Sequence, residues 1–204
     1  MTGVSRFGIV ELEDFPTDLR ERVGMIAERS GFVPNIFRAL ARRPAELRAF
    51  LDYHDALMNP ETCSQDRGDG SAVGGLSKAE RELVVVATSG ANHCTYCIVA
   101  HGAILRIRAR DPQLADQVAS NPWAATLNPR QRAIVDLALV IATRSAELTE
   151  HDLQQARAAG LSDDEIWDVG AITALFAMSN RLAHLMALRP NDEFFTMGRA
   201  ARGS

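Results

Sequence analysis

The sequence predicts a helical protein with a single domain. Three observations support this: apolar residues recur mostly at helical spacing, helix-capping patterns are frequent, and segments with the alternation of a β-strand are scarce. The chain has 204 residues, which is enough to bury a core without disulfides or a metal. We therefore expect one domain over residues 1–204.

Two helical segments are expected at the N-terminal end. Residues 17–29, TDLRERVGMIAER, carry apolar side chains at helical spacing, and Gly31 follows as a stop signal. The next helix is expected from GFVPNIF to about Met58. Pro44 interrupts it, because proline lacks the backbone N–H that a helix interior needs.

The composition changes at residues 59–75, NPETCSQDRGDGSAVGG, which are rich in Gly, Ser and Asp and poor in apolar residues. This composition predicts a flexible surface loop. Cys63 lies within it, and we interpret this residue as an incidental exposed cysteine rather than a third redox thiol.

Two consecutive helices are expected in the centre of the chain. Ser77 and Glu80 have the spacing of a capping box, which satisfies free amides at a helix start. This helix should run to about Ser89, where the stretch Ser-Gly-Ala-Asn breaks it. The second helix should begin within residues 92–94 and continue to about Arg108.

Capping residues place the next helices. A short helix is expected after Pro112, followed by one with Asn128 as its cap and Pro129 at its first position. Thr149 caps a further helix, which Gly160 ends.

An internal helical repeat is a further hypothesis. The opening of residues 127–143 resembles that of residues 76–88, with an offset of 51. The support is weak, because any two capped amphipathic helices resemble each other.

The last long helix begins at a second capping box, formed by Ser162 and Glu165. Residues 169–178 are apolar nearly all round, so we expect a central buried helix. Trp167 is interpreted as an aromatic side chain packed near its start. Residues 191–204 are expected to form a frayed tail.

Composition and charge argue against several functions. The net charge of −4 and the lack of a basic run disfavour a nucleic-acid surface. No apolar run reaches the roughly 18 residues of a membrane span, and the N-terminal residues lack the apolar core of a signal peptide. Three cysteines are unlike a secreted disulfide framework. We expect a cytoplasmic protein with no nucleic-acid or membrane partner.

The stretch HCTYCIVAHG carries most of the reactive groups of the chain. Cys94 and Cys97 are three residues apart, and His101 is four residues further, so a helix places all three on one face. The two sulfurs are then close enough to form a disulfide with little backbone movement. A helix start also favours a thiolate and lowers a cysteine pKa below its free value of about 8.5. These features predict a redox pair.

Thiol chemistry on a peroxide also requires proton transfer. The attacking thiol must lose a proton and the leaving alkoxide must gain one, and His101 is a suitable base. The imidazole needs an orienting group, usually a carboxylate, for which Glu80 and Glu82 are candidates. Glu82 is favoured, because it starts an apolar run while Glu80 belongs to the cap.

The full spacing resembles a known signature. Glu82, eleven residues, Cys94, two residues, Cys97, three residues and His101 are similar to the pattern of the alkylhydroperoxidase D family, within the carboxymuconolactone decarboxylase superfamily. Segments such as GFVPNIFRALARRP, LSKAERELVVVA and GLSDDEIWDVGAITALFAMSNRLA resemble its uncharacterised peroxidase-related branch, and the likeness covers residues 5–195.

This resemblance implies an all-α bundle, a homo-oligomer, and a site near a subunit interface. It implies that Cys97 attacks a hydroperoxide, Cys94 resolves the product, and Glu82 and His101 relay protons. An external dithiol or redox protein would restore the pair, with no metal, flavin or haem. Helix-end electrostatics by themselves favour the other cysteine, Cys94, as the thiolate.

Two features depart from the family. Its best-known members have histidine immediately before the second cysteine, where this chain has Tyr96. Tyr96 is an accessory hydrogen-bond donor on one interpretation and a packing residue on the other. The loop at residues 59–75 is also longer than the branch leads us to expect.

Other functions remain open at this point. The same residues suit a general thiol-disulfide oxidoreductase or a redox sensor. Cys94, Cys97 and His101, with His93 as a fourth ligand, suggest a metal-binding structural module, but one helix face does not easily enclose a tetrahedral zinc. The cysteines disfavour decarboxylation of the kind found in cysteine-free relatives.

Overall fold

The computed structural model describes residues 3–59 and 75–199, and all regular structure within them is helical. The predicted all-α class is therefore confirmed. The predicted loop at residues 59–75, including Cys63, falls almost entirely outside the described residues. The helices are η1 (Leu12–Asp14), α1 (Thr17–Ser30), α2 (Asn35–Leu40), α3 (Pro44–Met58), α5 (Lys78–Ala91), α6 (Thr95–Ala109), α7 (Leu114–Ser120), α8 (Pro129–Arg144), η2 (Ser145–Glu147), α9 (Glu150–Ala158), α10 (Asp163–Met186) and α11 (Glu193–Thr196).

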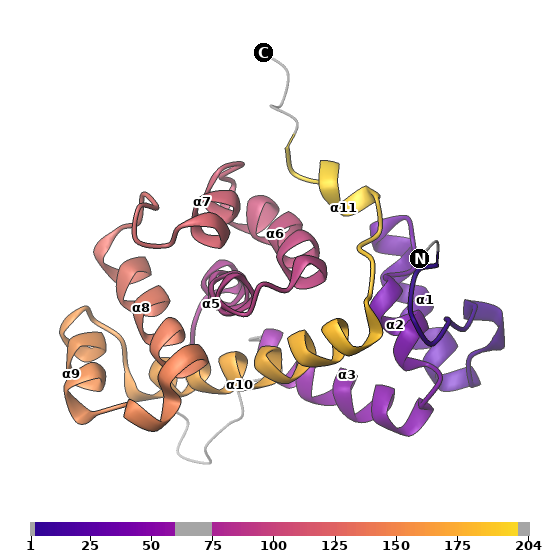
Figure 1. Ribbon diagram of the computed structural model, residues 1–204, viewed down its shortest axis with the longest axis horizontal. Coiled ribbons are helices and arrows are strands. Elements are labelled where there is room, and N and C mark those ends of the chain that lie inside the picture. Colours follow the sequence, from indigo (N-terminus) through magenta and orange to yellow (C-terminus); the bar gives the residue numbers. More distant parts are fainter. Residues whose placement is uncertain (1–2, 60–74, 200–204) are drawn as a thin grey trace, which may run out of the picture.

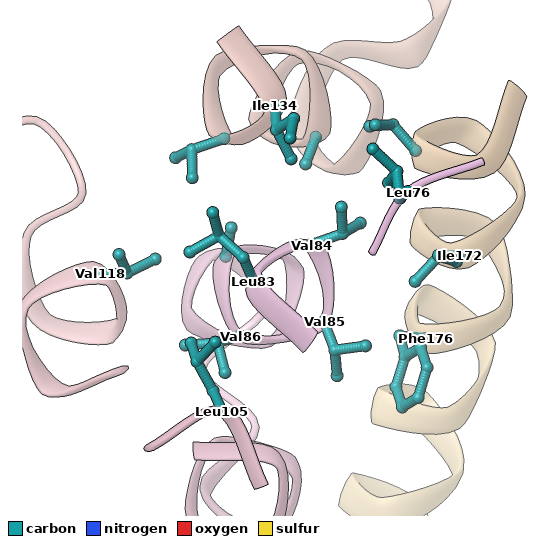
Figure 2. Close-up of a cluster of buried hydrophobic side chains, with 14 of the residues drawn as sticks. Leu76, Leu83, Val84, Val85, Val86, Leu105, Val118, Ile134, Ile172 and Phe176 are labelled. Carbon is teal, nitrogen blue, oxygen red and sulfur yellow. The ribbon is translucent and has the colours of Figure 1, made fainter. Parts of the chain in front are cut away.

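Helix α5 lies at the centre of the fold, with α6, α7, α8 and α10 around it (Figure 1). Every residue from 81 to 89 is buried. The side chains of residues 83–86 leave the helix in different directions, toward Ile134 on α8, Leu105 on α6 and Phe176 on α10 (Figure 2). Packing on all sides outweighs the modest helix propensity of consecutive valines.

A second apolar cluster joins α1, α2 and α3 to the start of α6 and the end of the chain. Leu19, Leu47 and Leu51 lie in its centre, each no more than 1% exposed. Cys94 and Cys97 also belong to this cluster. The cysteine pair therefore lies on the side of α6 that faces the N-terminal helices.

The helix starts match the capping patterns in the sequence. Ser77, Asn128 and Ser162 each accept a hydrogen bond from the amide three residues later, and the side chain at that position bonds back to the cap amide. Pro44 occupies the first position of α3, after α2 has ended at Leu40. The internal repeat stays a prediction. None of the described helices is long and apolar enough to cross a membrane.

Helix α5 ends at Ala91, within the Ser-Gly-Ala-Asn stretch where the break is predicted and two residues beyond Ser89. Gly90 does not end the helix but allows close packing. A Cβ atom at Gly90 would lie 3.1 Å from the carbonyl oxygen of Ala119 in α7. Gly90 therefore allows α5 and α7 to pack closely. From the sequence alone, a glycine at this position is interpreted as a helix stop.

The prediction that α10 is buried on all sides is wrong. One face is exposed, with Trp167 75%, Met178 46% and Leu185 55% accessible. Its buried residues, among them Val169, Ile172 and Phe176, pack into the core with residues of α5 and α8. Trp167 is accordingly not a packed aromatic residue.

The described part of the predicted tail, residues 191–199, is packed rather than frayed. Phe194 in α11 is 6% exposed, and its ring meets that of Phe32 edge-on at 4.8 Å. The buried guanidinium of Arg106 donates hydrogen bonds to the carbonyls of Phe194 and Met197, both at 3.0 Å. These long-range partners hold residues 191–199 against α6, and a terminal segment with such contacts does not fray.

We predict that Phe194→Ala lowers the free energy of unfolding by about 3 kcal/mol, because a buried aromatic side chain is lost from the core. Urea denaturation followed by circular dichroism measures the change. The matched control is Phe195→Ala, since Phe195 is 47% exposed and its loss should cost less than about 0.5 kcal/mol. Equal urea midpoints for the two variants would contradict the packed arrangement of α11.

Candidate active site

A tight turn between α5 and α6 presents the first cysteine. Asn92 ends α5, and His93 has a left-handed backbone with φ of 54°, which is uncommon for a residue with a side chain. The Cys94 amide donates to the carbonyl of Ser89 at 2.9 Å. Cys94 is the N-cap of α6, and its sulfur accepts a hydrogen bond from the amide of Cys97 at 3.4 Å.

Helix α10 fixes this turn through two residues one helical turn apart. Asn180 is completely buried. Its side-chain nitrogen Nδ2 donates to the Ser89 hydroxyl at 3.1 Å, and its Oδ1 accepts from the side-chain nitrogen Nδ2 of Asn92 at 3.0 Å. Nε2 of His184 lies 3.0 Å from the carbonyl oxygen of Asn92, where a ring N–H would donate. No local pattern in the sequence marks Asn180 or His184, because their partners are some 90 residues away.

The two thiols differ in their affinity for a proton. The hydrogen bond from the Cys97 thiol, together with the Cys97 amide and the charge of His184, lowers the pKa of Cys94 to about 7. The same thiol–thiol hydrogen bond, together with burial, raises the pKa of Cys97. Of the two thiols, Cys94 is therefore the one that ionises first, as helix-end electrostatics predict.

The predicted relay residues meet between α5 and α6. Glu82 is 2% exposed, and its Oε2 lies 2.8 Å from Nδ1 of His101. The ring of Phe176 packs edge-on against His101 at 4.7 Å and so restricts its rotation. The competing candidate, Glu80, caps α5 and pairs with Arg130 at 2.7 Å. The geometry thus selects Glu82 as the partner of His101.

Arg108, which is not among the predicted site residues, is part of the same network. Its Nη1 donates to the second carboxylate oxygen of Glu82, Oε1, at 3.0 Å, and to the carbonyl of Lys78 at 3.3 Å. Arg108 follows His101 by seven residues, so both lie on one side of α6. That spacing is the only signal in the sequence, and it is weak.

Tyr96 has a different position from these groups. Its hydroxyl accepts a hydrogen bond from the amide of Ile36 at 3.1 Å, and its side chain is buried, which raises the pKa of Tyr96. This contact joins α6 to α2 and fits the packing interpretation.

The connection from the relay to the sulfurs is indirect. Within the described residues, no hydrogen bond joins His101 to Cys94 or Cys97. A proton must therefore pass between His101 and a thiol through a bound water or the substrate itself. In the described part of the chain, no group of three or more His, Cys, Asp or Glu side chains is arranged to hold a metal ion.

Comparisons with known proteins show the family to which the chain belongs. The model of the carboxymuconolactone decarboxylase family matches residues 66–119, which contain both cysteines, Glu82 and His101. The crystal structure of an alkylhydroperoxidase AhpD core, an uncharacterized peroxidase-related protein from Ralstonia eutropha JMP134, is 49% identical over 99% of this chain and 100% of its own, with a TM-score of 0.90. This chain belongs to the carboxymuconolactone decarboxylase family, among its alkylhydroperoxidase-like, peroxidase-related members.

Other relatives of this peroxidase-related family member are more distant. An uncharacterized peroxidase-related protein from Silicibacter sp. TM1040 is 35% identical over 91% of both chains, with a TM-score of 0.80. The debrominase Bmp8 is 16% identical over 97% of both chains, with a TM-score of 0.74, and shares the fold alone. No match is found among the curated proteins.

We predict that the Cys94 thiol of this peroxidase-related protein titrates near pH 7. The value for a free cysteine is about 8.5. Below about pH 7 the Cys94 sulfur is protonated and the pair loses its negative charge. The measurement is thiolate absorbance at 240 nm in a Cys63→Ser background, which removes the third thiol.

Two variants test the cause of this shift. Cys97→Ala removes the largest contribution to the low pKa of Cys94, so the titration should move to higher pH. Cys94→Ala should show no thiolate near pH 7. An unchanged midpoint in Cys97→Ala would contradict the thiol–thiol hydrogen bond.

Proposed function

We propose that this protein reduces hydroperoxides with the Cys94–Cys97 pair, assisted by a Glu82–His101 proton relay. One observation carries the proposal: two buried free thiols at the start of α6 lie one helical turn before an imidazole that a buried carboxylate orients at 2.8 Å. Membership of a family with peroxidase-related members supports the same reaction. It requires an external dithiol or redox protein, and no metal, flavin or haem.

In the first step, Cys97 passes its proton to His101 through a bound water or the hydroperoxide. The Cys97 thiolate then attacks the O–O bond, which breaks as an S–O bond forms and leaves a sulfenic acid. The departing alkoxide takes a proton from the imidazolium of His101 and leaves as an alcohol. Glu82 stabilises the imidazolium during this exchange.

In the second step, the Cys94 thiolate attacks the sulfur of the Cys97 sulfenic acid. An S–S bond forms, and hydroxide leaves and takes a proton from solvent to give water. The external dithiol then supplies two electrons and becomes a disulfide, which restores both thiols. The low pKa of Cys94, about 7, suits this role, because a substantial share of the resolving sulfur is a thiolate at neutral pH.

A general thiol-disulfide oxidoreductase or redox sensor is the second candidate. The hydroxyl of Tyr96 is bound to the Ile36 amide, so the site has one proton carrier fewer than the best-known relatives. A protein disulfide as oxidant needs less proton transfer than a hydroperoxide does. The cytoplasmic location and homo-oligomeric state stay predictions in either case.

We predict that Cys97→Ser abolishes hydroperoxide consumption in an assay with excess dithiothreitol, because the attacking sulfur is lost. Without dithiothreitol, Cys94→Ser should complete a single turnover and stop as a sulfenic acid, which dimedone labels and mass spectrometry detects. Cys63→Ser is the control and should keep wild-type activity. Sustained turnover by Cys97→Ser would overturn the assignment of the attacking thiol.

The second candidate function has its own test. In Cys94→Ser, a mixed disulfide between Cys97 and a client protein would accumulate, because the resolving thiol is missing. Stable capture of one such client, with no turnover of any hydroperoxide by the wild-type protein, would favour the oxidoreductase over the peroxidase.

A further inference from the structure

The buried carboxylate of Glu82 has a different partner on each oxygen. His101 occupies Oε2 at 2.8 Å and Arg108 occupies Oε1 at 3.0 Å. The Glu82 side chain is 3% exposed, that of His101 14% and that of Arg108 28%. The carboxylate is therefore enclosed between a fixed cation and a group that can exchange protons.

Hydrogen-bond chemistry allows this trio only two neutral-histidine arrangements. A guanidinium only donates and stays protonated, so Oε1 of Glu82 must accept from Arg108. In the first arrangement Glu82 is ionised, and His101 carries its proton on Nδ1 and donates it to Oε2. In the second, Glu82 is protonated on Oε2 and donates to Nδ1, which leaves the histidine proton on Nε2.

Only the first arrangement provides a base. With the proton on Nδ1, Nε2 of His101 has a free lone pair and can accept a proton from a thiol. With the proton on Nε2, both ring nitrogens are occupied and His101 cannot act as a base at that edge. The protonation state of Glu82 therefore decides whether the relay works.

Burial opposes the working arrangement and Arg108 favours it. Removing a carboxylate from water favours its neutral form, whereas a permanent cation within hydrogen-bond distance favours the ionised form. The bond from Arg108 to the Lys78 carbonyl at 3.3 Å further holds the guanidinium against α5.

We propose that Arg108 is a positioning residue that keeps Glu82 ionised and thereby holds His101 in the Nδ1–H tautomer, with Nε2 as the base. The kinetic consequence rests on the proposed hydroperoxide reduction. The tautomer itself does not, because it is a property of the resting protein.

Nitrogen-15 NMR of the histidine-labelled full chain tests the tautomer directly, because ring Nδ1 and Nε2 shifts depend on which nitrogen carries hydrogen. The chain has five histidines, and the His101 signals are identified by their loss in His101→Gln. We expect the Nδ1–H pattern in the wild type. Arg108→Met should show the Nε2–H tautomer, and Arg108→Lys should restore Nδ1–H.

The same variants are assayed for hydroperoxide turnover. Arg108→Met should lose roughly tenfold to hundredfold in kcat, as is typical when a partner that orients a functional side chain is removed, and Arg108→Lys should recover most of it. Arg110→Met is the matched control, since Arg110 is exposed and makes no hydrogen bond or ion pair within the described residues. It should keep both the tautomer and the rate of the wild type.

A neutral variant separates charge from packing. Arg108→Gln keeps a donor toward Glu82 but has no charge, so it should behave like Arg108→Met, and it replaces that variant if the methionine protein does not fold. An unchanged Nδ1–H pattern in the folded neutral variants overturns the proposal. A tautomer change in a protein with no hydroperoxide turnover, wild type included, supports the role of Arg108 and overturns the proposed function instead.

Discussion

The all-round burial of α5 is the constraint on which the rest of the structure depends. A helix with neighbours on every side has no solvent-facing position for a charged residue, so its acids and bases need internal partners. Arg81, 1% exposed, donates to the carbonyls of Leu57 and Leu76 and pairs with Asp168 of α10 at 2.6 Å. Glu82 finds its partners on α6. The relay is thus a consequence of the way a buried carboxylate is satisfied in this fold.

Helix α10 holds α5 at both ends and so connects stability with the site. Near the start of α5, Asp168 binds Arg81, and at its end Asn180 binds Ser89 and the turn that carries Cys94. Between these anchors the Phe176 ring packs against His101. A single helix thereby sets the position of the first thiol and the orientation of the imidazole. One face of that helix is exposed while the other makes all these contacts.

The site separates its two acidic groups. Cys94 lies at the start of α6, where the Cys97 amide and His184 lower its pKa. Glu82 lies between α5 and α6, where Arg108 contacts one carboxylate oxygen and His101 the other. Among the described residues, His101 has no direct hydrogen bond to a sulfur. Proton transfer between them therefore needs a substrate or a water.

Many of the helix starts could be predicted from the sequence, because they depend on interactions between neighbouring residues. The caps at Ser77, Asn128 and Ser162 were predictable because each involves residues three apart, and the use of Glu80 in a cap directed attention to Glu82. Tertiary structure decided what depends on distant partners. Gly90 lies inside α5, where α7 packs closely against it. Residues 191–199 are held in place by contacts with Arg106 and Phe32. Arg108 and Asn180 belong to the site because folding brings them into contact with residues that are distant in the sequence.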